Sequence, residues 1–247
     1  MHGLIDDFDV SAADVAKEID VSGTACLIGV VTEEWLTEAR ECVDSYLPMH
    51  GRHGVYIKDP AANKGSFAHQ LVTDHRIESL VKALAVAGCP RLNTGRQGID
   101  SALRILVGPG PRRPLLFHYD STVVTMVVPI TVPDAGAGTS GELILCPNRR
   151  PYRRFVITNI VEKFVLQTDL YRKRFVRKLG KNRDVKVVKL EPGNAYLFWG
   201  YRAFHATLPC APGALRATLM LHYGELHSGD PLLATSKTLS KKLRALR

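Results

Sequence analysis

The chain has 247 residues, of which 45% are hydrophobic and 23% charged, and its 33 Lys+Arg exceed its 24 Asp+Glu by a net charge of +9. These fractions are typical of a soluble globular protein and exclude collagen-like, low-complexity and long disordered chains. The sequence has no apolar run of the roughly 18 residues that cross a bilayer, and its acidic start lacks a signal-peptide pattern. We therefore expect a cytoplasmic protein with no membrane span and with one large domain.

The cysteine spacing is not that of a small domain held together by zinc or by disulfides. They are five in number, widely scattered, and none forms a Cys-x-x-Cys pair: Cys26, Cys42, Cys89, Cys146 and Cys210. This spacing favours neither a zinc knuckle nor a disulfide framework. Most have apolar neighbours, so we expect nearly all to be buried free thiols.

The positive charge is concentrated in one segment. Residues 149–189 contain 14 Lys+Arg and 3 Asp+Glu, a net +11, so the rest of the chain carries +9 − 11 = −2. A second, smaller basic run closes the chain at 237–247. Concentrated positive charge attracts phosphates, carboxylates, nucleic acid or anionic lipid, although a solvated helical face has the same composition.

Residues 1–99 are predicted to be rich in helix. Cap residues and apolar spacing predict a helix over 11–20 with Ser11 as its N-cap, a buried strand over 24–31, an amphipathic helix over 33–46, and a helix that opens at Thr73 or Asp74 and ends before Gly88 and Pro90. These helices precede a region of different character.

Residues 100–224 are predicted to form a β-core. Short apolar runs bounded by Gly, Pro, Asn or Asp predict strands over 102–107, 115–119, 123–132, 142–146, 185–190, 195–199 and 215–223, as in a sandwich or barrel. A basic insertion at 149–184 interrupts these strands. We expect the insertion to be helical, because a stripe of apolar residues recurs in it at helical spacing: Ile160, Phe164, Tyr171, Phe175 and Leu179. Residues 225–247 form a basic tail. We expect a single domain.

Three residues form a candidate metal site. His118 and Asp120 point to the same face if they lie on a strand, and His205 follows another predicted strand after a Pro-Gly turn. Two imidazoles and one carboxylate form the facial triad of non-haem Fe(II) oxygenases, which leaves coordination positions open. A lone His-x-Asp occurs by chance and is most often a surface pair, so the prediction rests on the order of the surrounding features.

That order resembles the iron(II)/2-oxoglutarate-dependent oxygenases, and within them the phytanoyl-CoA-dioxygenase-like group. The likeness covers most of the chain. His118-x-Asp120 is similar to the first metal pair of that group, and residues 141–148 (GELILCPN) to its G-x-L-x-x-x-P-G-S-H segment, with Asn148 for the second Gly and Arg149-Arg150 for Ser-His. Residues 190–198 followed by His205 resemble its GD-x-x-x-F…H segment, with Asn194 in place of the acid.

The resemblance implies a fold, cofactors and a reaction. The fold would be α+β with a mainly β core, a double-stranded β-helix (jelly roll) with N-terminal packing helices and the basic helical insertion. His118, Asp120 and His205 would hold Fe(II), and the enzyme would couple oxidative decarboxylation of 2-oxoglutarate by O2 to oxidation of an unactivated C–H bond. Hydroxylation is the expected outcome, although desaturation, ring closure and epimerisation use the same triad.

Arg216 and Thr218 resemble the Arg-x-Ser/Thr that holds the distal carboxylate of 2-oxoglutarate. A guanidinium can grip a carboxylate with two parallel hydrogen bonds, and an unpaired charge in an apolar strand would be costly. Thr218 shares the strand face of Arg216, so its hydroxyl adds a third donor. Arg104 is a second charge in an apolar strand and a further candidate, although a structural salt bridge explains it equally well.

The substrate is predicted to be a small molecule. The basic insertion and the resemblance favour an anionic or carrier-tethered metabolite, including one attached to an acyl carrier or CoA, with the insertion closing as a lid over the pocket. Nucleic acid is not favoured as a partner, because the second downstream arginine of nucleic-acid demethylases is missing. A protein or RNA hydroxylase, a cupin-like metal enzyme without 2-oxoglutarate and a non-catalytic nucleic-acid-binding domain stay as alternatives.

Overall fold

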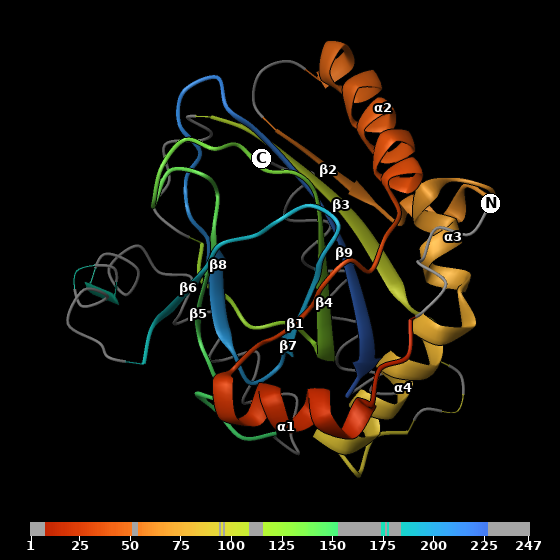
Figure 1. Cartoon of the computed structure of the whole chain (residues 1–247). Helices are drawn as coiled ribbons and strands as arrows, with labels where there is room; N and C mark the ends of the chain where they lie inside the picture. The colour runs from red at the N-terminus through yellow and green to blue at the C-terminus, as the bar shows by residue number, and fades with distance from the viewer. Residues whose placement is uncertain are drawn as a thin grey trace, which may run out of the picture.

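The computed structural model describes residues 8–50, 54–93, 95, 97–108, 116–152, 174–175, 177 and 184–226. Helices come first and most strands follow, as Figure 1 shows. The elements are α1 (Ala12–Ser22), β1 (Ala25–Leu27), α2 (Glu33–His50), β2 (Val55–Lys58), a 3-10 turn η2 (Pro60–Ala62), α3 (Phe67–Thr73), α4 (His75–Gly88), β3 (Asp100–Val107), β4 (Thr122–Thr131), β5 (Leu143–Cys146), β6 (Lys186–Val188), β7 (Ala195–Trp199), β8 (Phe204–Thr207) and β9 (Leu215–Glu225).

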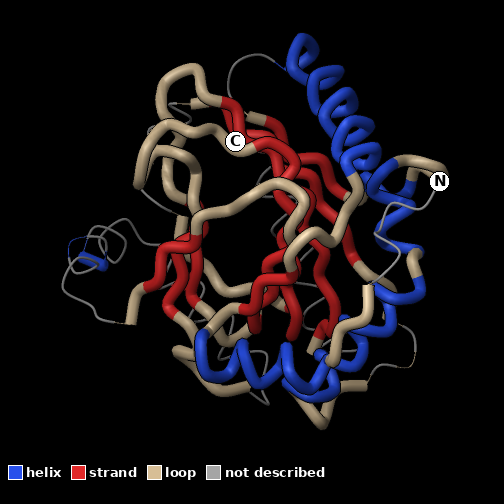
Figure 2. The backbone as a smooth tube through the Cα atoms, in the orientation of Figure 1, coloured by secondary structure: helices blue, strands red, loops and turns tan. Residues whose placement is uncertain are grey.

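The described strands form two antiparallel sheets. The major sheet has the order β1-β7-β4-β9-β3-β2, and the minor sheet has the order β6-β5-β8. Helices α2, α3 and α4 lie against one face of the major sheet, and the minor sheet lies across its other face (Figures 1 and 2). Two facing antiparallel sheets with helices from the N-terminal part on one side agree with the predicted jelly roll.

The helix ends follow the cap residues that the sequence offers. The Ser11 hydroxyl accepts a hydrogen bond from the backbone N–H of Asp14 at 3.3 Å, and Gly23 ends α1 in the left-handed conformation at φ 81°. Asp74 caps α4 by accepting from the N–H of Arg76 at 2.9 Å. The three helices predicted in residues 1–99 are thus confirmed, although α2 runs on to His50, and α3 was not predicted.

The outer face of the major sheet is apolar and packs on the helices. Alternate residues of β9 point there and are buried: Ala217, Leu219, Leu221 and Tyr223. Trp35 of α2 is 2% exposed and donates from its indole N–H to the carbonyl of Phe67 at 2.8 Å. Burial of such a side chain contributes roughly 1.5–3 kcal/mol, so this layer fixes the position of the sheet.

The inner face of the major sheet, which lies toward the minor sheet, has an apolar part and a polar part. Around β4 and β7, Val127, Tyr196 and Phe198 pack with Leu143 and Leu145 of the minor sheet. Along β9, the inward positions are instead polar or intermediate in exposure: Arg216, Thr218, Met220 and His222. The register sets two further polar residues beside them, because Arg104 is paired with Thr218 and Thr125 with His222. The polar part carries every candidate 2-oxoglutarate contact.

The minor sheet is covered on its outside by an aromatic cluster. Phe175, from the insertion, packs against Phe117 at 4.9 Å and Phe204 at 5.1 Å between ring centroids. Ile144 and Cys146 of β5 belong to the same cluster, on the face opposite to Leu143 and Leu145. If the insertion closed as a lid, its apolar stripe, including Phe175, would cover the pocket. In the structure, the Phe175 ring instead packs on the apolar outer surface of β5 and β8. The other stripe residues of the insertion lie outside the described residues.

Several predicted boundaries were wrong. Of residues 115–119, the described ones form no strand, and His118 makes only an isolated bridge to His205. β2 and β8 were not predicted, because each has only four residues and a short run gives a weak periodic signal. The cysteines are all free, but Cys26 is exposed and Cys42 half-buried, so the prediction of burial holds for Cys89, Cys146 and Cys210.

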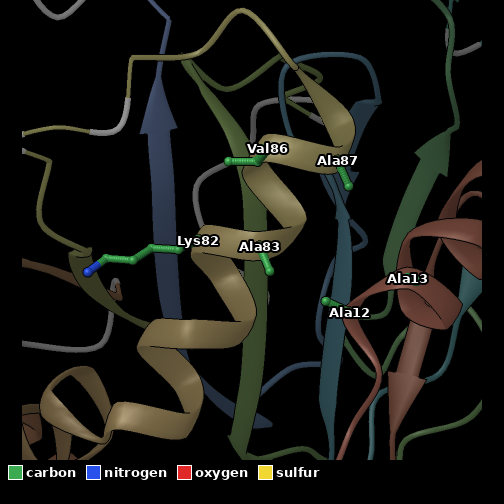
Figure 3. Close-up of a pocket in the computed structure, with 6 residues that line it drawn as sticks. All are labelled: Ala12, Ala13, Lys82, Ala83, Val86 and Ala87. Carbon is green, nitrogen blue, oxygen red and sulfur yellow. The ribbon is translucent and has the colours of Figure 1, made fainter.

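A groove of about 610 Å³ lies between α1 and α4, as Figure 3 shows. It is lined by small and apolar residues with one lysine at its edge: Ala12, Ala13, Lys82, Ala83, Val86 and Ala87. None of these residues belongs to the inner face of the major sheet, so the groove is separate from the candidate site. None of the described helices combines the length and the hydropathy that crossing a bilayer requires.

Candidate metal centre

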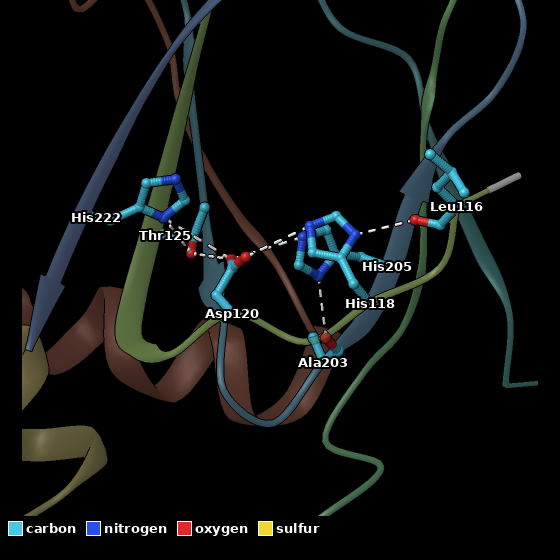
Figure 4. Close-up of polar contacts among 7 residues, drawn as sticks. All are labelled: Leu116, His118, Asp120, Thr125, Ala203, His205 and His222. Carbon is cyan, nitrogen blue, oxygen red and sulfur yellow. Dashed lines mark hydrogen bonds and ion pairs between the residues drawn. The ribbon is translucent and has the colours of Figure 1, made fainter. Parts of the chain in front are cut away.

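The structure brings His118, Asp120 and His205 together. Their ligand atoms all lie within 4.8 Å of one another, and they form the single such group among the described residues. Nε2 of His118 is 3.5 Å from Oδ1 of Asp120, and Nε2 of His205 is 3.6 Å from Oδ2 (Figure 4). These separations exceed those of good hydrogen bonds, but they suit atoms that share one ion roughly 2 Å from each. The three residues therefore fit a metal.

Short backbone pairings position the three side chains. His118 and His205 exchange two backbone hydrogen bonds, of 2.9 and 3.0 Å, although only His205 lies within a strand. The N–H of Asp120 donates to the carbonyl of Gly200, just after β7, at 3.0 Å. The sequence predicted a strand over 115–119 and treated His118 and Asp120 as side chains on one strand face. Instead, each residue is fixed separately to the segment that leads into His205.

Both imidazoles present Nε2 to the centre because Nδ1 is engaged elsewhere. Nδ1 of His118 lies 3.0 Å from the carbonyl of Leu116, and Nδ1 of His205 lies 3.0 Å from the carbonyl of Ala203 (Figure 4). A carbonyl can only accept, so Nδ1 carries the proton and Nε2 keeps a free lone pair. Metal-bound histidines in proteins are commonly oriented in this way.

The surroundings set protonation states that suit a metal. Burial alone would raise the pKa of Asp120, but the neighbouring histidines, led by His205, and the Thr125 hydroxyl outweigh it and lower the pKa to about 2. Burial lowers the pKa of His205 to about 4, against the opposing charge of Asp120. A carboxylate and a neutral imidazole therefore face each other at neutral pH.

Two polar residues that the sequence analysis did not select support Asp120. The Thr125 hydroxyl donates to Oδ2 of Asp120 at 2.5 Å and lies 3.2 Å from Nδ1 of His222. Because a hydroxyl has one proton, Thr125 accepts from the Nδ1–H of His222. His222 lies on the inner face of β9, as Arg216 does. No motif marks Thr125, and only the register between β4 and β9 reveals its contact with His222.

Arg216 lies on the same inner face and is 2% exposed. Its Nη1 donates to the Thr218 hydroxyl at 3.3 Å, whereas its Nε has no hydrogen-bond partner among the described residues. Burial and the neighbouring charge of Arg104 lower its pKa to about 10, so it stays protonated at neutral pH. Gly141 makes room for it, because a Cβ there would collide with Cδ of Arg216.

A buried cation of this kind calls for an anion. Glu142 is an acid whose charge raises the pKa of Arg216. Its carboxylate, however, accepts hydrogen bonds from the backbone N–H groups of Gly138 at 2.6 Å and Ser140 at 3.2 Å. No carboxylate within the described ranges forms an ion pair with Arg216. An unpaired buried charge costs several kcal/mol, so a bound carboxylate fits this position.

Arg104 lies directly opposite Thr218 in the β3–β9 register and is half-buried. Burial lowers its pKa, and the charges of Tyr56 and Cys210 act against that shift. The salt bridge that the sequence left open as an alternative is not formed with any acid in the described part of the chain. Arg104, Thr218 and Arg216 thus form one polar group on the inner face.

The comparisons with known proteins agree on the fold. HygX from Streptomyces hygroscopicus, solved with nickel and 2-oxoglutarate bound, superposes with a TM-score of 0.58 at 13% identity, over 89% of this chain and 88% of that chain. The non-heme alpha ketoglutarate dependent epimerase SnoN gives 0.58 at 14% identity, over 87% and 83%. A Pseudomonas putida prolyl-4-hydroxylase gives 0.52 at 13% identity, over 87% and 94%. The fold is that of 2-oxoglutarate-dependent oxygenases.

The sequence itself gives no closer match. It matches no protein-family model, and no curated protein matches it. The predicted likeness to the oxygenase superfamily is therefore supported through the fold, whereas the phytanoyl-CoA-dioxygenase-like group stays a prediction.

Proposed function

We propose that this protein is an Fe(II)- and 2-oxoglutarate-dependent dioxygenase. The observation that carries the proposal is the combination of two features between the two sheets. A His-Asp-His group has the spacing of ligands to one ion, and a buried arginine on the inner face of the major sheet has no ion-pair partner in the described chain. A metal chelated by an acid with a second carboxylate satisfies both features at once.

His118, Asp120 and His205 would hold the iron, which when bound would supply the redox chemistry with dioxygen. The chain's own residues bind and orient. The Leu116 and Ala203 carbonyls keep the Nε2 lone pairs aimed at the ion, and Thr125 orients the Asp120 carboxylate. Arg216 and Thr218, with Arg104 beside them, would bind the distal carboxylate of 2-oxoglutarate through charge-assisted hydrogen bonds.

The apolar half of the inner face keeps water away from one side of this site. Val127, Tyr196 and Phe198 meet Leu143 and Leu145 there, and all five are buried. A dry wall strengthens the interaction between Arg216 and an anion, because charges attract more strongly in a medium of low dielectric constant.

Anaerobic titration tests the proposal most directly. Fe(II) followed by 2-oxoglutarate is added to the protein, and the weak visible charge-transfer band of the chelate is recorded. We expect a saturable band for the parent protein and none for His205→Ala. A chelate band that is absent while Fe(II) still binds would favour a cupin-like metal enzyme that does not use 2-oxoglutarate.

The substrate we propose is a small metabolite with negative charge, free or attached to a carrier such as CoA or an acyl carrier protein. The net +11 of residues 149–189 supports this proposal, because a positive field raises the local concentration of anions. Similar folds serve both prolyl hydroxylation and nogalamycin biosynthesis, so the fold alone does not favour either substrate size.

The charge proposal has its own test. Arg172, Arg174 and Arg177 are changed together to Gln, and substrate-coupled succinate formation is followed over a salt series. We expect weaker coupling and a flatter salt dependence, with 2-oxoglutarate affinity retained. Kinetics equal to those of the parent at every ionic strength would remove the insertion from substrate binding and leave it a solvated helical face.

A further inference from the structure

Arg150 lies between the two segments that carry the candidate metal ligands. Its guanidinium carbon is 3.9 Å from the ring centroid of Tyr119 and 4.0 Å from that of Tyr201. Its Nε donates to the backbone carbonyl of Tyr201 at 2.6 Å, and the residue is only 7% exposed. A flat cation is thus buried between two aromatic rings.

Each of the two tyrosines belongs to one of these segments. Tyr119 stands between His118 and Asp120 in the chain. Tyr201 stands between Gly200, whose carbonyl binds the N–H of Asp120, and Ala203, whose carbonyl receives Nδ1 of His205. The Arg150 side chain therefore contacts the residue between His118 and Asp120 and a residue of the turn that precedes His205.

The backbone of the same loop strengthens this link. The N–H groups of Arg149 and Arg150 both approach the carbonyl of Arg202, at 3.0 and 3.4 Å. The loop after β5 is thereby tied to the turn between β7 and β8. A displacement of Arg150 would move this turn, and with it the carbonyls that orient Asp120 and His205.

Arginine is suited to this position and lysine is not. A guanidinium is planar and stacks on an aromatic ring with each face, and the attraction grows when water is excluded. A lysine ammonium is a strongly hydrated point charge that cannot fill the flat space between two rings. Burying a cation here is costly unless the contacts compensate, so the position demands this shape as well as this charge.

We propose that Arg150 is a positioning residue for the metal centre. By clamping Tyr119 against Tyr201, it sets the separation between the His118–Asp120 pair and His205, and so governs how tightly the three ligands hold the ion. This inference rests on the proposed function, because it assigns to Arg150 a role toward the metal that the triad would bind.

Metal affinity without turnover gives the test. We compare the parent, Arg150→Lys and Arg149→Lys by anaerobic Fe(II) titration calorimetry and by the position of the visible chelate band with 2-oxoglutarate. Arg149 is the matched control, because it is the adjacent arginine, is exposed and lies over Phe175 and Phe204 at 4.9 and 5.7 Å. We expect Arg150→Lys to bind Fe(II) roughly ten-fold or more weakly and to shift the band, as changes behind metal ligands do. Arg149→Lys should match the parent in both measurements.

A second pair of variants separates positioning from general stability. Tyr119→Phe keeps the ring under Arg150 and should retain the parental Fe(II) affinity and band position. Tyr119→Leu removes the ring and should reproduce the loss seen in Arg150→Lys, and the double variant should be little worse than either single one. This pair also decides the question if Arg150→Lys does not fold.

The outcomes distinguish the inference from the function beneath it. Parental Fe(II) affinity in both Arg150→Lys and Tyr119→Leu would overturn the role of Arg150 and leave the metal centre intact. An equal loss in Arg149→Lys would overturn it as well, because the effect would then not depend on the sandwich. A parent protein that binds no Fe(II) would overturn the proposed function and this inference together.

Discussion

Gly200 lies so close to Asp120 that a side chain at position 200 would occupy the space of the Asp120 carboxylate. The Gly200 carbonyl accepts from the Asp120 N–H at 3.0 Å. A Cβ at position 200 would lie 2.7 Å from Oδ2 of Asp120 and would also collide with the Thr125 hydroxyl. The absence of a side chain at Gly200 is what allows Thr125 and Asp120 to meet.

Gly200→Ala should therefore damage the metal centre more than the fold. The new methyl group forces Asp120 and Thr125 apart, so we expect Fe(II) affinity to fall roughly 10- to 100-fold, as for other changes behind a metal ligand. Titration calorimetry measures the affinity, and Gly98→Ala serves as control, because no atom lies within 4 Å of a Cβ there. Unchanged affinity in Gly200→Ala would show that the carboxylate can move without cost to the site.

Loss of one imidazole should abolish metal binding while the protein stays folded. His205 contributes a ligand atom and lies 8% exposed beside Asp120. In His205→Ala, we expect Fe(II) affinity to fall more than roughly 100-fold and succinate formation to disappear. His75→Ala, an exposed histidine outside the site, should behave as the parent does. Full turnover in His205→Ala would remove this residue from the ligand set.

Arg216→Lys separates charge from shape in co-substrate binding. The substitution keeps a cation but loses the planar fork and the contact to Thr218. We expect the affinity for 2-oxoglutarate to weaken by about 1–3 kcal/mol, the range for a hydrogen bond to a charged group, with Fe(II) affinity unchanged. Titration of 2-oxoglutarate into the Fe(II)-loaded protein checks this, and an unaltered affinity would place the carboxylate elsewhere.

Asp74 gives a prediction about stability and pH. Burial would raise its pKa, but hydrogen bonds from the side chain and backbone N–H of Arg76 outweigh it, so the folded pKa lies below the unfolded value of about 3.9. The cap therefore stabilises the folded protein at pH values above the unfolded pKa of Asp74, and this stabilisation is lost as the pH falls through the folded pKa. Asp74→Ala should cost about 1 kcal/mol of unfolding free energy near neutral pH and progressively less below pH ~4.

Ser11→Ala is the control for that experiment. The Ser11 hydroxyl caps α1 in the same manner but does not titrate. The decrease in unfolding free energy caused by Ser11→Ala should therefore be the same across the pH range. Urea unfolding of both variants from pH 3 to 7 makes the comparison. Parallel pH profiles for the two variants would contradict the assignment of the effect to the Asp74 carboxylate.

The sequence predicted the features that local chemistry determines. The caps at Ser11 and Asp74 and the apolar run of β7 come from a few adjacent residues, and the structure has them where they were expected. His118, Asp120 and His205 were selected because their order along the chain resembles a known pattern. Their spatial proximity agrees with that selection.

The sequence did not predict the features that depend on register and long-range contact. Thr125 meets His222 because β4 pairs with β9 at one particular register, and no short motif encodes that pairing. Arg150 was noticed only as a departure from a family segment, since its two tyrosine partners lie 31 and 51 positions away in the chain. Phe175 was placed over the pocket because a helical stripe shows which side is apolar but not which surface it covers.

The two histidines of the centre differ in how they meet the solvent. The His118 side chain is 49% exposed and comes from a bridge outside any strand, whereas His205 lies within β8 and Asp120 is 10% exposed. We therefore expect an incoming ion, or a chelator that removes it, to reach the centre from the His118 side. Metal exchange would then depend more on the exposed imidazole than on the two buried ligands.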